Sequence, residues 1–103
     1  MTSHIVQVFL PLGRPDGSPQ PSEAFAGVRK ELLGRCGGVT IYARAPAEGL
    51  WQDDEGVAAD RIVIFEVMDD NFDPDWWSRY KVSLQSQFDQ EEILIRAIAA
   101  VRL

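Results

Sequence analysis

The sequence predicts one α+β domain whose four strands and two helices follow in the order β-α-β-β-α-β. Four runs rich in β-branched and aromatic residues alternate with two segments that carry apolar residues at helical spacing. Clusters of proline, glycine and aspartate separate these segments. The chain has 103 residues, which is enough for a single domain over 1–103 and too few for two. This order is that of the ferredoxin-like fold, a four-stranded antiparallel sheet with both helices on one face.

The first third of the chain predicts a strand followed by a helix. Residues 4–12, HIVQVFLPL, are the strand, and the next nine residues hold three prolines and two glycines and so form a loop. Ser22 is the expected N-cap of the helix, and Gly37 is its expected left-handed C-cap. The apolar face of this helix consists of Phe25, Val28, Leu32 and Cys36.

The remainder predicts two strands, a second helix and a last strand. Residues 39–45 and 61–68 are the second and third strands, and residues 91–101 are the fourth. Asp73 and Pro74 have the chemistry of an N-cap and a first helical residue. The stripe of the second helix is spaced by four, at Trp76, Tyr80, Leu84 and Phe88. We expect Trp76 in the core and Trp77 pointing aside, toward a cleft between the helix and the hairpin.

Strand alternation assigns a wholly apolar set of side chains to the sheet face beneath the helices. The opposite face carries a mixed set: Ile5, Gln7, Phe9, Tyr42, Arg44, Ile64, Glu66, Met68, Leu94 and Arg96. A solvated face would hold fewer large apolar groups. We therefore expect a second copy of the chain to cover it, as a two-fold, sheet-to-sheet homodimer.

The segment ARAPAEGLWQDDEG, residues 43–56, has the composition of a loop but contains Leu50 and Trp51. One interpretation is an extended hairpin arm that lays Trp51 on a partner or across the mouth of a cavity. The other is that Trp51 folds back on the edge of its own sheet.

Five polar side chains project from the open face: Gln7, Tyr42, Arg44, Glu66 and Arg96. Charges within an apolar face are costly unless paired, so we expect Glu66 to meet Arg44 or Arg96. Two interpretations stay open. In one, an ion-pair network fixes the register of the dimer. In the other, Arg44 and Arg96 bind an anionic ligand together with Gln7, Trp51 and Trp77, and Glu66 or Tyr42 moves a proton.

Composition argues against several other functions. Ten basic and sixteen acidic residues give a formal charge of -6, which disfavours nucleic acid and anionic membranes as partners. With His4 and Cys36 as the lone residues of their types, neither a metal nor a cofactor is expected. The four aspartates within residues 69–75 lack the spacing of a calcium loop. The N-terminus lacks a signal-peptide pattern, so we expect a cytoplasmic protein.

Three segments resemble small bacterial proteins of unassigned activity: GGVTIYARAPAEGLW (37–51), DRIVIFEV (60–67) and YKVSLQSQFDQEEILI (80–95). The likeness is carried by Gly49, Trp51, Phe88, Gln90 and Glu91. The group looks like the dimeric α/β-barrel class, which includes cofactor-free monooxygenases, muconolactone-isomerase-like enzymes and ligand binders. The resemblance implies a dimer with a cavity and assigns no reaction.

Together these observations predict a homodimer that binds a small molecule on the open sheet face or serves a structural role. The alternative is a cofactor-free enzyme, monooxygenase- or isomerase-like, that acts on a small aromatic or anionic metabolite.

Overall fold

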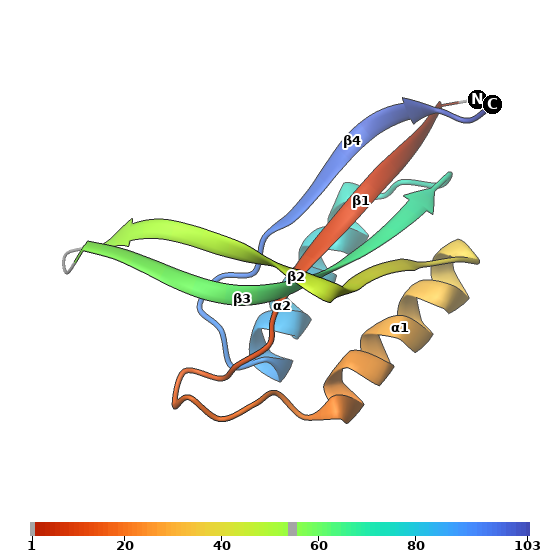
Figure 1. Ribbon diagram of the computed structural model, residues 1–103. Coiled ribbons are helices and arrows are strands. Elements are labelled where there is room, and N and C mark those ends of the chain that lie inside the picture. Colours follow the sequence, from red (N-terminus) through yellow and green to blue (C-terminus); the bar gives the residue numbers. More distant parts are fainter. Residues whose placement is uncertain (1, 54–55) are drawn as a thin grey trace.

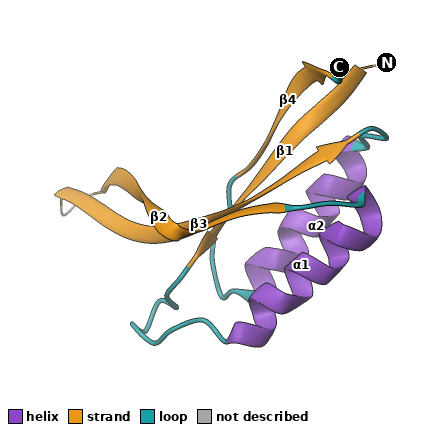
Figure 2. Ribbon diagram, turned by 45° about the vertical axis from the view of Figure 1, so that its right-hand side comes forward, coloured by secondary structure: helices purple, strands orange, loops and turns teal. Residues whose placement is uncertain are grey.

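A computed structural model describes the backbone of residues 2–53 and 56–103 and the side chains of residues 3–42 and 61–103. Its elements are β1 (Thr2–Pro11), α1 (Ser22–Cys36), β2 (Thr40–Asp53), β3 (Gly56–Asp69), α2 (Pro74–Gln87) and β4 (Ile95–Val101). The strands form one antiparallel sheet in the order β2-β3-β1-β4, and both helices cover the same face of it (Figures 1 and 2). The predicted ferredoxin-like architecture is confirmed.

The ends of the helices follow local capping chemistry, with one departure from prediction. Asp73 caps α2 by accepting hydrogen bonds from the backbone N–H groups of Asp75 and Trp76, at 3.0 and 3.4 Å. Gly37 closes α1 with φ 81°. The predicted Ser22 cap is wrong, because α1 begins at Ser22 itself and Pro21 is the N-cap. The extended Pro21 provides its carbonyl to Ala24 N–H at 3.1 Å, so the first turn closes one residue earlier.

The core lies between the helices and the inner face of the sheet. Alternate residues of β1 and β3 supply its floor, and both helices supply its roof. Its buried members are Val6, Val8, Leu10, Val28, Leu32, Val63, Phe65, Val67, Trp77, Leu84, Phe88 and Ile93. The predicted inward faces of β1 and β3 are thus confirmed.

The two adjacent tryptophans have exchanged the places predicted for them, because Trp77 lies in the core and Trp76 does not. Trp77 is 4% exposed and donates from Nε1 to Oδ2 of Asp69 at 2.8 Å. Trp76 is half-buried, stacks on Tyr80, and carries the Arg35 guanidinium 3.9 Å from its ring centroid. A stripe spaced strictly by four drifts about 40° around the helix at each step, so by Trp76 it has left the sheet-facing side. Trp77 lies seven residues before Leu84 and therefore shares its face.

The segment expected to be a loop instead extends the hairpin between β2 and β3. β2 continues to Asp53, and β3 begins at Gly56. The register shifts between the Tyr42–Ile64 and Ala47–Ile62 pairs, so four residues of β2 face one of β3. Beyond this bulge the hairpin projects away from the helices as an arm (Figure 1). The arm was among the expected arrangements, and the bulge was not.

The last strand is shorter than predicted. β4 begins at Ile95, and residues 91–94 lead into it from the end of α2. In the part of the chain that the structure describes, no helix is long and apolar enough to cross a membrane.

Candidate functional site on the open sheet face

The sheet face without helices is organised in cross-strand rows. The middle row is polar and crosses all four strands: Arg96 on β4, Gln7 on β1, Glu66 on β3 and Thr40 on β2. The row on one side is apolar and contains Ile98, Ile5 and Met68. The row on the other side contains Leu94, Phe9, Ile64 and Tyr42. Directly opposite side chains in such rows are close enough to contact one another.

A chain of hydrogen bonds follows the polar row. Arg96 donates from Nε to Oε1 of Gln7 at 2.7 Å, and Gln7 donates from Nε2 to Oε1 of Glu66 at 2.8 Å. Tyr42 donates from Oη to the other carboxylate oxygen of Glu66, Oε2, at 3.3 Å. Both oxygens of Glu66 are therefore engaged by uncharged donors, and the guanidinium is linked to the carboxylate through an amide.

The predicted direct pair between Glu66 and Arg96 does not form. β1 lies between β3 and β4, so the two residues are two strand spacings apart, or roughly 10 Å. Gln7 fills that gap and bonds to each of them. Glu66 and Arg96 are thus linked indirectly, and we call the hydrogen-bonded set of Arg96, Gln7, Glu66 and Tyr42 the relay. The alternative partner, Arg44, lies outside the described side chains.

The relay assigns different chemical roles to Tyr42 and Glu66. The negative charge of the neighbouring Glu66 raises the pKa of Tyr42, with smaller contributions from burial and from their hydrogen bond. At neutral pH the phenol therefore keeps its proton and acts as a donor. Glu66 is then the acceptor of the pair, and the only one of the two suited to act as a base.

Arg96 retains capacity for a further partner. Its guanidinium lies over the Phe9 ring, 5.1 Å from the centroid, and its side chain is exposed. Among the side chains that the structure describes, its single hydrogen bond is the one from Nε to Gln7. The two terminal amino groups of the fork are the part that recognises carboxylates.

Apolar and aromatic side chains, some of them exposed, flank the polar row. Tyr42, Leu94 and Ile98 are 47%, 50% and 50% exposed, and Ile5, Phe9, Ile64 and Met68 are half-buried. A contiguous apolar patch of this kind is typical of a contact surface.

The structure brings together four of the seven predicted site residues: Gln7, Tyr42, Glu66 and Arg96. Trp77 lies elsewhere, in the core beneath the helices and bonded to Asp69. Arg44 and Trp51 belong to β2, in the range 43–60 whose side chains the structure does not describe, so their roles stay predictions.

Other features singled out in the sequence are packed among the elements. His4 stacks on Phe72, with ring centroids 4.3 Å apart. Burial raises the pKa of the Cys36 thiol to about 11, and the nearby Asp69 charge contributes to the shift. Within the described ranges, no group of three or more histidine, cysteine, aspartate or glutamate side chains is placed to hold a metal ion.

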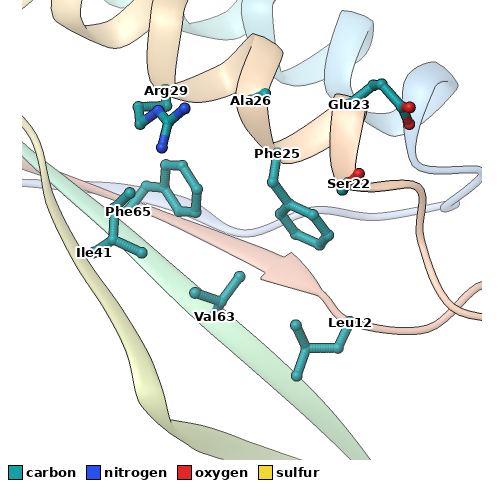
Figure 3. A pocket seen from close by; sticks show the side chains of 9 residues that line it. All are labelled: Leu12, Ser22, Glu23, Phe25, Ala26, Arg29, Ile41, Val63 and Phe65. Carbon is teal, nitrogen blue, oxygen red and sulfur yellow. The ribbon is translucent and has the colours of Figure 1, made fainter.

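Sequence reasoning missed two features. Thr40 joins the polar row, which only the strand register reveals. A cavity of about 510 Å³ also lies on the helix-covered side, between α1 and strands β2 and β3 (Figure 3). It depends on how closely α1 approaches the sheet, a distance that no residue pattern encodes.

Fold and site together define a ferredoxin-like α+β domain with an uncovered, partly polar sheet face. No protein-family model matches the chain, and no curated protein matches it in sequence. Among solved structures it is similar to a divalent cation tolerance protein (Cut A1) from Thermus thermophilus, with a TM-score of 0.65 and 13% identity. That match covers 97% of this chain and 85% of the other.

The chain is similar as well to a phage SAM lyase, whose structure contains S-methyl-5'-thioadenosine. The TM-score is 0.65 and the identity 12%, over 93% of this chain and 80% of the lyase. At these identities the likeness is one of fold alone.

Proposed function

We propose that the protein forms a homodimer through the open face of its sheet and binds a small anionic molecule at the polar row enclosed there. One observation carries the proposal: the hydrogen-bonded side chains of Arg96, Gln7 and Glu66, joined by Tyr42 from the adjoining row, lie on an open face whose flanking rows are apolar and partly exposed. The single cysteine fits a cytoplasmic location.

The face is self-complementary in charge as well as apolar. A two-fold interface pairs the same patch on both subunits, so each residue meets the partner's copy of another residue. The row has a cation at the β4 end and a carboxylate near the β2 end. When two copies face each other in antiparallel orientation, each Arg96 approaches the other subunit's Glu66.

The same geometry fits a ligand with a carboxylate and an apolar body. In this arrangement the ligand carboxylate, in place of the other subunit's Glu66, would take the terminal amino groups of Arg96 in a bidentate pair. The neighbouring Phe9 and Leu94 would cover the apolar part. A site with a few convergent polar groups on apolar surroundings is the usual form of a small-molecule site.

The Glu66–Tyr42 hydrogen bond favours a second candidate function, cofactor-free proton transfer on the bound molecule. Glu66 would remove a proton from a carbon next to a carbonyl of the ligand, and Tyr42 would donate its proton to the oxygen that becomes negative. Glu66 would then return the proton to a different carbon while the enol O–H proton passes back to Tyr42, which restores the carbonyl and both side chains and completes an isomerisation without an external reactant.

Mass determination by light scattering at micromolar concentration tests the dimer. We expect a dimer for the native chain, monomers for Arg96→Glu, and a dimer for the control Arg79→Glu, which changes an exposed arginine on α2. A native chain that stays monomeric refutes the interface. Calorimetric titration with benzoate then tests the ligand, and equal affinity in the native chain and in Arg96→Gln would rule out the arginine fork.

A further inference from the structure

The cavity on the helix-covered side of the sheet is formed within one chain. Its volume of about 510 Å³ lies within the range of small-molecule sites. Six of its nine lining residues carry purely apolar side chains: Leu12, Phe25, Ala26, Ile41, Val63 and Phe65. It is separated by the sheet from the row of Gln7, Glu66 and Arg96, which faces the other way.

Phe25 points from α1 toward the sheet, and Val63 and Phe65 rise from β3 beneath it (Figure 3). The Phe25 and Phe65 rings are inclined by 25°, with centroids 6.5 Å apart. Val63 and Phe65 are buried, whereas Phe25, Leu12 and Ile41 are half-buried although they pack against the core. The hollow therefore leaves apolar surface uncovered next to a flat ring.

One of the residues that α1 contributes to the cavity lining is small, so a larger side chain there would narrow the cavity. Ala26 lines the cavity from the first half of α1, and its side chain is exposed. Leucine at this position would cost at most a few tenths of a kcal/mol in helix propensity, and its side chain would take up part of the cavity. A single substitution can thus narrow the cavity.

The two ends of the cavity differ in the charged groups beside them. The Arg29 guanidinium lies at the end near Phe65 and Ile41 and is directed toward the sheet (Figure 3). At the other end, the Glu23 carboxylate is turned away from the cavity (Figure 3). Among the residues whose side chains are described, no carboxylate lies within ion-pair distance of Arg29.

We propose that this cavity binds an aromatic carboxylate, with the ring against Phe25 and Phe65 and the carboxylate on Arg29. The apolar lining and the two phenyl rings select a flat apolar body. The cation at one end selects a negative charge on that body, and a charge-assisted hydrogen bond fixes its orientation. This site does not depend on the dimer or on Arg96.

NMR titration of the ¹⁵N-labelled protein with 2-naphthoate tests the site. We expect saturable shifts at the amides of Ala26, Arg29 and Phe65. The neutral 2-naphthamide should bind roughly tenfold or more weakly, because it lacks the charge-assisted bond. In Arg29→Gln the naphthoate should lose that advantage and bind as weakly as the amide.

Two further variants complete the test. Ala26→Leu should weaken binding severalfold while the thermal midpoint stays the same or rises, and the control Arg79→Gln should bind as the native chain does. The proposal fails if naphthoate binds Ala26→Leu with native affinity, or if its shifts fall only at Gln7, Glu66 and Arg96. It fails as well if the amide shifts do not saturate at millimolar ligand. It also fails if dilution of the ligand-free protein shifts the amide resonances of the cavity residues, because a second copy of the chain would then occupy the cavity. A monomeric result in the scattering experiment leaves this test unaffected.

Discussion

Asp69 is a buried carboxylate that ties together three elements of the fold. It ends β3, is 3% exposed, and accepts hydrogen bonds from Trp77 Nε1 of α2 at 2.8 Å and from the Asn71 backbone N–H at 3.0 Å. Arg35 at the end of α1 places its Nε 3.6 Å from the same carboxylate. We expect Asp69→Ala to be strongly destabilising, because the two hydrogen-bond donors lose their acceptor and Arg35 loses its counter-ion.

The size of this loss in stability depends on which of the three groups water can reach once the carboxylate has been removed. Trp77 is 4% exposed, so its indole N–H would stay buried without a partner, at a cost of about 1–3 kcal/mol. The Arg35 side chain is 22% exposed, so its charge recovers part of its hydration. Asn71 is exposed, so its backbone N–H can donate to water instead. The loss of free energy of unfolding should total about 3 kcal/mol, or roughly 12 °C in the thermal midpoint for a domain of this size.

Urea unfolding, followed by circular dichroism and tryptophan fluorescence, measures this loss. The adjacent Asp70 offers a comparison: it is exposed, and it accepts hydrogen bonds from the buried Ser3 hydroxyl and from the exposed Arg102, so Asp70→Ala should cost about 1–2 kcal/mol, less than Asp69→Ala. A double-mutant cycle with Trp77→Phe should give a coupling of about 1–2 kcal/mol. Equal losses at positions 69 and 70, or a coupling near zero, would refute the role assigned to this carboxylate.

Three other predictions follow from the same contacts. Glu66→Gln should lower the pKa of Tyr42, since the Glu66 charge is the main cause of its upward shift. Absorbance at 295 nm measures the titration of Tyr42 alone, because burial raises the pKa of Tyr80, the other tyrosine, out of the accessible range. An unchanged titration would contradict the relay. Cys36, whose pKa is raised to about 11, should react with a disulfide reagent at pH 8.5 at least tenfold more slowly in the folded chain than in urea, and equal rates would place it at the surface. Asp73→Ala should cost about 1 kcal/mol in urea unfolding through loss of the α2 cap, and Asp75→Ala, two residues further on, should cost less.

The sequence was sufficient for those parts of the fold in which local pattern and burial agree. β1 and β3 alternate apolar residues toward the helices over their central lengths, so the inward set from Val6 to Val67 was predictable. The outward set was predictable for the same reason, and it contains the four residues that form the relay. The relay itself was not, because it depends on the register that sets Gln7 opposite both Glu66 and Arg96.

The failures fall where composition and structure give opposite signals. Pro46 and the acidic residues after it have the composition of a loop; a hairpin arm was one interpretation of this segment, but the bulge at which the arm begins was not predicted. Asp69 looked like one member of an acidic cluster near a helix start. Its role depends on the Trp77 indole, which reaches it across the turn to α2, and no spacing rule predicts that contact.

Because successive residues of a strand point to opposite faces, β3 serves both candidate sites at once. Val63 and Phe65 line the cavity, while Ile64 and Glu66 belong to the open face. A substitution within β3 therefore disturbs both sites through one backbone and cannot separate them. Arg29 and Arg96 are the informative positions, since they come from α1 and β4 and act on opposite sides of the sheet. Loss of carboxylate binding in one variant and not in the other would assign the ligand to a single face of this fold.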